Sequence, residues 1–456
     1  MKKSKIILLI LLGGVLLVSG FQCKLFPQSG KIVNKVKPIT LNYWRVNDGP
    51  DSFSDIIFAF RKIYSHVNIN YRQFRPEEYE MALLEAWAED RGPDIFSTPN
   101  TWLGKYETKI LPMPQEITVG RQVLTGTIKK EYKVVLETKK IPTTREFREN
   151  YVDTVFQDVY RQNKLLGIPL SLDVLALYYN RDLLNNAKIV EPPKTWQEFV
   201  EDVRLTTIKD RSGNIIQSGV AMGMADNIPN SADILSLLML QNETQMINPS
   251  GLGTAINRPS LIDQNYYPGE EALRFYTDFS NPTKETYSWN KEMPDALEMF
   301  IQGKTAFFIG DPSYLDIVRT RAPKLNFDIA KMPQIEGSIK EINYANYWVE
   351  AVSKKTAYPN EAWNFLLFMS DPLNVKSYLD RAKHPTAHRA LIKTQREDLD
   401  LAPFVDEILT AKSWYLGKDY LTVEKAFKQM INNILSGKKS IKEAIEFCAQ
   451  QVNQTY

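Results

Sequence analysis

Cysteine and histidine are scarce in this chain, which has 456 residues with 2 cysteines and 3 histidines. The two cysteines, Cys23 and Cys448, predict no internal disulfide, because Cys448 falls on the apolar stripe of a C-terminal helix and is expected to pack as a small apolar group. No cluster of cysteines or carboxylates accompanies the histidines at a metal-ligand spacing. We therefore expect no disulfide framework, no metal and no other cofactor.

Two of the histidines, His384 and His388, have the i, i+4 spacing that can chelate a metal on a helix. Pro385 follows His384 directly, which indicates that His384 stands at a helix start. No further ligand completes a site. The spacing therefore predicts a pair of surface histidines.

A charge excess of one sign is also missing. The chain has 56 Lys and Arg against 54 Asp and Glu, a net charge of +2, so no large field would attract nucleic acid. The sequence contains no G-x-S-x-G, no phosphate-binding P-loop and no G-x-G-x-x-G after a strand. These absences favour a binding protein over an enzyme.

Long apolar runs are absent except at the N-terminus, where Ile6–Val18 follows Lys2, Lys3 and Lys5. This is the pattern of a secretory signal, so we expect an exported chain. Cys23 stands where a bacterial lipoprotein carries its lipid, although the preceding residues depart from the usual lipobox. The alternative is an uncleaved anchor. Residues 1–23 are thus expected to be a signal sequence or membrane anchor, and residues 24–38 a polar linker. A lipidated Cys23 or an uncleaved N-terminal helix would each hold the protein at the outer face of the cell membrane.

What is present predicts two folded lobes. The chain exceeds the roughly 250–300 residues at which one hydrophobic core stops growing, and its hydrophobic fraction of 43% is ordinary for a globular protein. Strands at 39–44, 67–71 and 94–97 alternate with helices at 53–63 and 79–87. This order implies a parallel sheet, whose ligands bind beyond the carboxyl ends of the strands.

After Gly167 helices dominate, at 197–205, 232–240, 270–279 and 295–301, with strands at 305–309 and 327–331. The chain then returns to the first lobe for a helix at 360–369. Two final helices follow, and Ser440 with Glu443 forms a capping box for the last. Residues 119–145 fit no part of this scheme and are expected to be an insertion or a surface hairpin.

Several separated stretches carry a family resemblance. They are LLGIPLSLDVLALYYNRDLL from Leu165, PPKTWQEF from Pro192, GPD from Gly92, PNTW from Pro99, GKTAFFIG from Gly303, WVEAVS from Trp348, AWNFLLFMS from Ala362, and SGKKSIKEA from Ser436. Together they resemble the extracellular solute-binding proteins of ATP-binding cassette importers, in the sugar-binding, maltose-binding-protein-like branch (family 1).

The resemblance implies a periplasmic-binding-protein-like α/β fold, with two lobes, central sheets, two or three hinge crossings and a ligand cleft between the lobes. It implies a first lobe of 39–170 plus 349–378 and a second of 171–348 plus 379–456. The implied partners are a small solute, expected to be a mono- or oligosaccharide, and a membrane permease. We expect a monomer that closes as a clamshell.

A sugar presents an apolar face of C–H groups and a rim of hydroxyls, so its site needs aromatic platforms and polar side chains. Trp87, Trp196 and Trp363 are expected to be structural, and Trp289 and Trp414 are weaker ligand candidates. Family position and strand ends give the predicted ligand-binding residues: Trp44, Asp48, Asn100, Trp102, Asp173, Tyr179, Asp311, Trp348 and Glu350. For Glu350 the alternative is an ion pair with a lysine.

Two other functions stay open at this point. One is an exported glycan-processing enzyme that uses a carboxylate pair such as Asp173 and Glu350. The two carboxyl groups would have to lie about 5–9 Å apart, on either side of a glycosidic bond. The other is a sensory binding module on the same fold.

Overall fold

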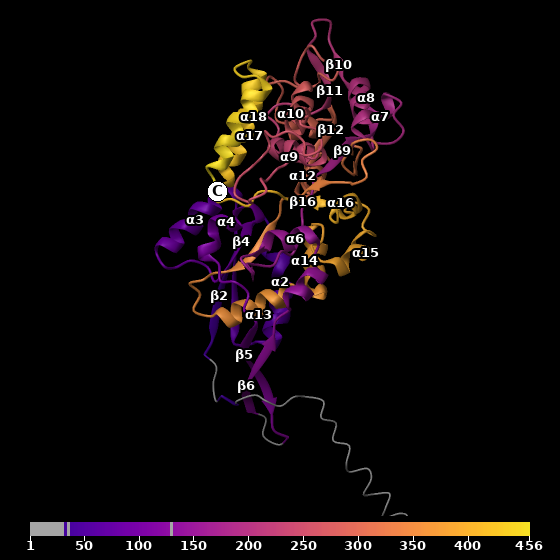
Figure 1. Ribbon diagram of the computed structural model, residues 1–456. Helices are drawn as coiled ribbons and strands as arrows, with labels where there is room; N and C mark the ends of the chain where they lie inside the picture. Colours follow the sequence, from indigo (N-terminus) through magenta and orange to yellow (C-terminus); the bar gives the residue numbers. More distant parts are fainter. Residues whose placement is uncertain (1–31, 34–36, 128–130) are drawn as a thin grey trace, which may run out of the picture.

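The computed structural model describes residues 32–33, 37–127 and 131–456, and Figure 1 shows two α/β lobes stacked end to end. The predicted signal or anchor and Cys23 lie outside the described residues. Within those residues, no helix combines the length and apolar character needed to cross a bilayer.

The sheet of the first lobe has the strand order β15-β4-β2-β3. Strand β2 pairs in parallel with β3 and β4, while β15 is antiparallel to β4. The predicted alternation of strands and helices is therefore confirmed. Its elements are β2 (Ile39–Val46), α2 (Pro50–Ile63), β3 (Val67–Phe74), α3 (Pro76–Ala88), β4 (Ile95–Pro99) and β15 (Trp348–Val352).

The sheet of the second lobe has the order β10-β11-β12-β9-β13, in which β9 is antiparallel to β12 and β13. Its strands are β9 (Ala176–Asn180), β10 (Ile208–Lys209), β11 (Ile215–Val220), β12 (Thr305–Gly310) and β13 (Phe327–Ala330). Its helices are α7 (Arg181–Asn186), α8 (Trp196–Thr206), α9 (Ser231–Gln241), α10 (Pro268–Asp278), α11 (Ala296–Ile301), α12 (Ser313–Arg321), α17 (Tyr420–Leu435) and α18 (Ile441–Asn453).

Local capping fixes where several of these helices begin. The side chains of Thr195 and Ser440 each accept a hydrogen bond from the backbone N–H three residues on. The carboxylates of Glu198 and Glu443 in turn accept from the backbone N–H groups of Thr195 and Ser440. The last helix, α18, packs on α17 and α10, and Cys448 is fully buried there as predicted.

Residues 119–145 include most of an antiparallel hairpin, β5 (Glu116–Thr125) and β6 (Glu131–Lys140), which confirms the hairpin alternative. A short strand, β1 (Ile32–Val33), pairs with β6, so part of the predicted linker is a strand. The hairpin projects from the end of the first lobe that faces away from the second (Figure 1).

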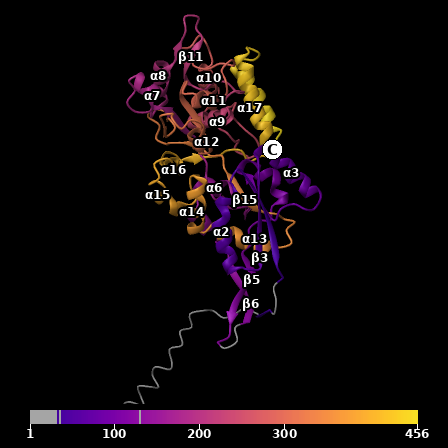
Figure 2. The same cartoon turned by 180° about the vertical axis from the view of Figure 1, so that it is seen from behind.

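Three segments connect the lobes and pair with one another at the waist of the molecule, which Figure 2 shows from behind. Bridges join Ile168 to Glu350, Val174 to Ala345 and Ser171 to Thr386. Gly167 is required here, because a Cβ at this position would lie 2.5 Å from the carbonyl oxygen of Glu350. The three crossings fix a hinge axis.

Shorter elements complete the chain. They are η1 (Asn100–Trp102), α4 (Leu103–Tyr106), η2 (Glu107–Lys109), α5 (Thr144–Asn150), α6 (Asp153–Val159), β7 (Tyr160–Arg161), β8 (Lys164–Leu165), β14 (Asn343–Tyr344), α13 (Pro359–Met369), α14 (Pro372–Ala382), η3 (Arg389–Leu391), α15 (Ile392–Gln395), α16 (Ala402–Glu407) and β16 (Ala411–Lys412). Trp87, Trp196 and Trp363 are buried, which agrees with the prediction that these tryptophans are structural.

Candidate functional site

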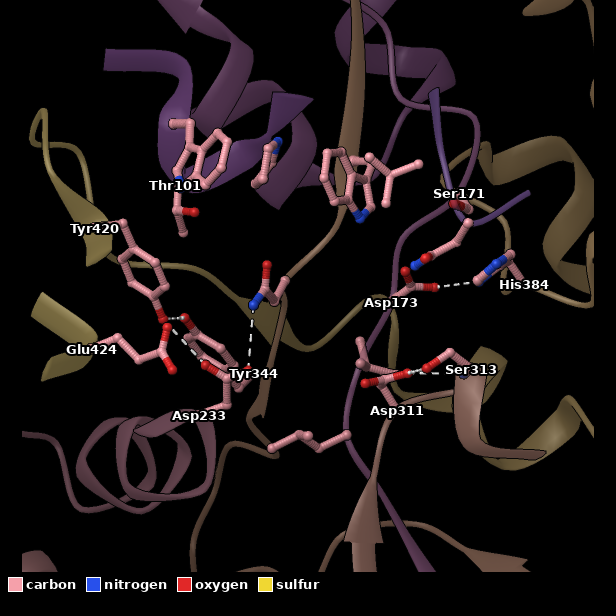
Figure 3. Close-up of a pocket in the computed structure, with 18 of the residues that line it drawn as sticks. Thr101, Ser171, Asp173, Asp233, Asp311, Ser313, Tyr344, His384, Tyr420 and Glu424 are labelled. Carbon is pink, nitrogen blue, oxygen red and sulfur yellow. Dashed lines mark hydrogen bonds and ion pairs between the residues drawn. The ribbon is translucent and has the colours of Figure 1, made fainter. Parts of the chain in front are cut away.

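A cavity of about 280 Å³ lies where the two lobes and the crossings meet. The ends of strands from both sheets supply its walls, as expected for ligand sites in α/β sheets. Figure 3 shows these side chains converging from both lobes. Five of the nine predicted ligand-binding residues line it: Asp48, Trp102, Asp173, Asp311 and Trp348.

The other four predicted residues lie outside the cavity lining. Trp44 is buried against Phe74, with the guanidinium of Arg72 over its ring. Side chains alternate between the two faces of a strand, so a residue near a strand end can still face the core. Trp44 is such a case, and its predicted contact with ligand is not favoured by this geometry.

Asn100, Tyr179 and Glu350 also face elsewhere. The amide of Asn100 is buried and donates to Asp158. Tyr179 is half-buried on β9, where it is paired with Phe307 of β12 on one side and Asp328 of β13 on the other. Glu350 is completely buried behind the cavity.

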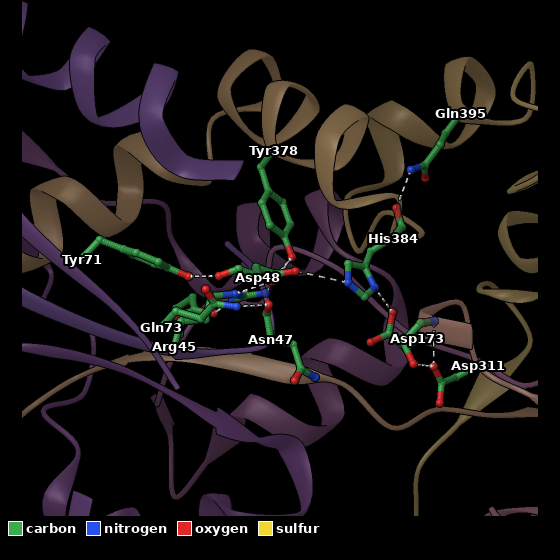
Figure 4. A network of polar contacts seen from close by, with 12 residues as sticks. Arg45, Asn47, Asp48, Tyr71, Gln73, Asp173, Asp311, Tyr378, His384 and Gln395 are labelled. Carbon is green, nitrogen blue, oxygen red and sulfur yellow. Dashed lines mark hydrogen bonds and ion pairs between the residues drawn. The ribbon is translucent and has the colours of Figure 1, made fainter. Parts of the chain in front are cut away.

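Glu350 belongs to a buried charge network that reaches the cavity wall (Figure 4 shows its Arg45–Asp48–His384 part). Arg45 forms ion pairs with Glu350 and, through Nε at 2.6 Å, with Asp48. Its other terminal nitrogen donates to the Tyr378 hydroxyl at 2.6 Å. Burial opposes ionisation of Asp48, but Arg45 and His384 outweigh it and lower the pKa of that carboxyl. The predicted pairing of Glu350 with a lysine is replaced by a pairing with arginine.

The prediction of a surface histidine pair is wrong. Helix α14 ends at Ala382, because Lys383 takes a left-handed conformation with φ of 56°, and neither histidine is helical. His384 lines the cavity, with Nδ1 2.9 Å from Asp173 Oδ1 and Nε2 3.5 Å from Asp48 Oδ1. Burial lowers the pKa of its imidazole, but Asp173 and Asp48 reverse this and raise it well above the usual value.

His388 is buried as well and contacts the ring of Tyr151. Among the described residues, no group of three or more His, Cys, Asp and Glu is arranged to hold a metal ion. His384 thus lies at the cavity between the lobes, and His388 packs against Tyr151 of the first lobe.

Sequence reasoning also missed one side of the cavity, which is formed by Asp233, Tyr344, Asn346, Tyr420 and Glu424. Asp233 accepts hydrogen bonds from Tyr420 and Asn346, at 3.2 and 3.3 Å. Burial raises the pKa of Asp233 to about 7. The one signal for Asp233 was its place in the first turn of α9; the tyrosines come from segments that only the tertiary fold brings together.

Partly exposed indoles give the cavity two aromatic surfaces. Trp102 follows β4, and Trp348 begins β15, so both come from the first lobe. Trp289 and Trp414, the weaker candidates, are buried and lie outside the lining. The arrangement offers stacking surfaces from one lobe and carboxylates from the other, which suits reversible binding of a ring that carries hydroxyl groups.

The carboxylate pair required by the enzyme alternative is not formed. Asp173 faces the cavity, but Glu350 is buried and accepts from Ser97 and Arg45 instead. The two carboxyl groups therefore cannot flank one glycosidic bond from opposite sides.

Known proteins share this sequence pattern. The family described as bacterial extracellular solute-binding protein matches residues 47–374. Maltodextrin-binding protein MdxE of Bacillus subtilis is 24% identical over 327 residues, which cover 68% of this chain and 72% of the relative. A putative binding protein of Brucella abortus is 23% identical over 193 residues. That match spans only 41% of this chain and 42% of the relative's length.

Solved structures share the fold. A solute-binding protein of Thermotoga lettingae bound with α-D-tagatose superposes with a TM-score of 0.67 at 17% identity, over 92% of this chain and 100% of that one. The sugar-binding protein MalE of Xanthomonas citri gives 0.70 at 17% identity, over 91% and 97%. These likenesses confirm the two-lobed fold. Because the family pattern covers residues 47–374 of 456, the chain belongs to the bacterial extracellular solute-binding proteins.

Proposed function

We propose that this chain is a tethered receptor that captures a carbohydrate in the cavity between its lobes and delivers it to the permease of an ATP-binding cassette importer. Family membership places the protein outside the cytoplasm. The observation that supports a sugar is the pairing of partly exposed Trp102 and Trp348 with carboxylates across one cavity. Relatives named for maltodextrin and galactooligosaccharide binding agree with this choice.

Capture requires no covalent chemistry. The ligand favours the closed state only through contacts that the open state lacks, and a sugar held between the indoles and Asp311 would touch both lobes. We place the first boundary between the lobes at 170/171. The second fits better at 347/348 than at 348/349, because Trp348 is the first residue of β15 in the sheet of the first lobe. The third boundary fits better after α14, at Lys383, than at 378/379, because α14 packs against α2 of the first lobe.

A thermal-shift screen of mono- and oligosaccharides, polyols and phosphorylated glycerols tests the proposal. We expect at least one carbohydrate to stabilise the protein without any increase in reducing ends. Trp102→Ala and Trp348→Ala should each weaken its binding about tenfold or more, which corresponds to about 1.4 kcal/mol. Tyr132→Ala, at an aromatic that is 72% exposed on the hairpin, is the matched control. Equal affinities in all three variants would refute the assignment of the cavity.

The tether is the second part of the proposal. It is either a lipid on Cys23 or an uncleaved N-terminal helix. Mass spectrometry of the membrane-bound protein distinguishes the two, because lipidation removes residues 1–22 and adds acyl mass to Cys23. A Cys23→Ala variant that stays in the membrane fraction would support the helix.

A further inference from the structure

Carboxylates outnumber cations along the cavity of the proposed receptor. Five acidic residues line it against two basic ones: Asp48, Asp173, Asp233, Asp311 and Glu424, with Arg45 and His384. A ligand enclosed there meets this charge at close range, because closing the lobes removes the water that would screen it.

The two lining cations are already paired with two of these carboxylates and with Glu350 behind them, and a third carboxylate is paired with a lysine outside the cavity. Arg45 pairs with Asp48 and Glu350, and His384 lies between Asp48 and Asp173. Glu424 pairs with Lys428 at 2.7 Å, one helical turn away on α17. Two carboxylates in the cavity therefore remain without a cationic partner among the described residues.

These two are Asp233, in the first turn of α9, and Asp311, directly after β12 (Figure 3). Asp233 accepts only from neutral groups, Tyr420 and Asn346. Asp311 accepts from the backbone N–H of Ser313 at 2.8 Å and from its hydroxyl. Both belong to the second lobe, so they face the indoles of the first lobe across the cavity.

Enclosing an unpaired carboxylate is costly unless the ligand supplies hydrogen-bond donors or a positive charge, or the acid takes up a proton. Burial raises the pKa of both acids, and that of Asp233 to about 7. A cationic ligand would remove the cost directly. The hydroxyl groups of a neutral sugar would offset part of the cost by donating hydrogen bonds but would leave the negative charge uncompensated, and an anionic ligand would add repulsion.

We propose that the cleft selects an amino sugar, whose ring packs on Trp102 or Trp348 and whose ammonium group pairs with Asp233 or Asp311. The inference rests on the proposed carbohydrate-binding function and adds the charge of the ligand to it. A metal ion is a poorer occupant, because no three-ligand group is present among the described residues.

Isothermal titration calorimetry with matched sugars tests the selection. The probes are D-glucosamine and D-galactosamine, the parent D-glucose and D-galactose, the corresponding uronic acids, and the 1,4-linked dimers of each, at pH 7. We expect an amino sugar to bind about tenfold or more tightly than its neutral parent, and the uronic acids to give no measurable heat. The preference should shrink as salt is added.

Variants then test which carboxylates are responsible for the preference for an amino sugar. Asp233→Asn and Asp311→Asn should each reduce the ratio of amino-sugar to neutral-sugar affinity, and the double variant should abolish it. Asp316→Asn removes an exposed carboxylate of the same lobe that lies outside the cavity, so it should leave the ratio unchanged. Circular dichroism confirms that each variant is folded.

The outcomes separate this inference from the proposed function. A neutral sugar that binds as tightly as its amino analogue overturns the inference and leaves the carbohydrate receptor intact. The same holds if both asparagine variants keep the full preference. If no carbohydrate in either screen binds, the proposed function fails and the inference fails with it.

Discussion

At the scale of single residues, the buried ion pair between Arg45 and Glu350 is the clearest determinant of stability near the cavity. Glu350 is 0% exposed, so Glu350→Ala would leave Arg45 in the interior with one carboxylate fewer. Removing one partner of a buried pair costs about 3–5 kcal/mol. We expect a corresponding loss in the free energy of unfolding, measured by urea denaturation.

The matched control is Glu298→Ala, which breaks an ion pair with Arg321 on the surface. Exposed pairs are screened by solvent and contribute little, so this variant should unfold at nearly the wild-type urea concentration. If the Glu350 and Glu298 variants behave alike, the Arg45 network is not buried in solution.

His384 gives the protein a pH-dependent stability of predictable sign. Asp173 and Asp48 raise the pKa of its imidazole above the unfolded value, which is about 6.5. Its contribution is therefore complete below about pH 6.5 and is lost as the pH rises through the folded-state pKa. Relative to His384→Gln, the wild type should be most stabilised at low pH, and the difference in unfolding free energy between the two proteins should narrow as the pH rises.

His66 supplies a control of opposite sign. Burial lowers the pKa of this histidine, so its contribution is present above about pH 6.5 and is lost as the pH falls. Unfolding curves of His384→Gln and His66→Gln from pH 5 to 9 should deviate from the wild type at opposite ends. If the unfolding free energies of both variants deviate from the wild type at the same end of the pH range, the pairing of His384 with Asp173 and Asp48 is contradicted.

The type of a residue predicted cavity contact less well than its location just after the end of a strand did. Asp48, Trp102 and Asp311 follow strand ends and reach the cavity. Trp44 is adjacent to the lining residue Arg45 but points into the core, because a one-residue step on a strand reverses the side chain. Glu350 lies two residues along β15 from Trp348 but is buried, where it pairs with Arg45. His384 was missed because its partners, Asp48 and Asp173, are distant in sequence.

At the scale of elements, local signals predicted several helices correctly. The capping box at Ser440 and the helical spacing of Phe53, Ile56 and Phe60 predicted helices that the structure confirms. The segment after α14 was mispredicted, because the left-handed Lys383 ends the helix and its sequence carries no glycine to signal this. The residues that follow form a lobe crossing instead.

The crossing at Gly167 depends on close backbone packing. A Cβ there would lie 2.5 Å from the Glu350 carbonyl oxygen and 2.6 Å from Val349 Cγ1, so Gly167→Ala forces two crossings apart. We expect a loss of about 1–3 kcal/mol in unfolding free energy and a change in ligand affinity, because the hinge geometry shifts.

Gly213→Ala distinguishes packing from backbone strain. Gly213 has φ of 88° and open space around its Cβ position, so its substitution costs about 1–2 kcal/mol through backbone conformation alone. It lies in the second lobe, next to β10 and β11 and outside the cavity lining, and should leave ligand affinity unchanged. If Gly167→Ala also leaves ligand affinity unchanged, the spacing of these crossings does not determine the geometry of the ligand cleft.

At the scale of the whole molecule, the two sheets and their connections account for a hinged receptor. The lobes have separate sheets, and backbone hydrogen bonds between crossings hold the waist, such as those between Ile168 and Glu350 at 2.9 and 3.0 Å. The arrangement resists sliding and permits rotation about one axis. His384 reinforces the waist, because it connects Asp48 of the first lobe to Asp173 of a crossing.

Rotation about this waist predicts a ligand-dependent change in overall shape. A ligand held by Trp102 and Trp348 on one lobe and by Asp233 and Asp311 on the other shifts the population toward a closed form. Small-angle X-ray scattering should therefore show a smaller radius of gyration with saturating ligand than without it. The Trp102→Ala, Trp348→Ala double variant, at the same ligand concentration, should keep the ligand-free value. A wild-type protein that binds ligand by calorimetry yet keeps an unchanged radius would show that the cavity fills without movement of the lobes.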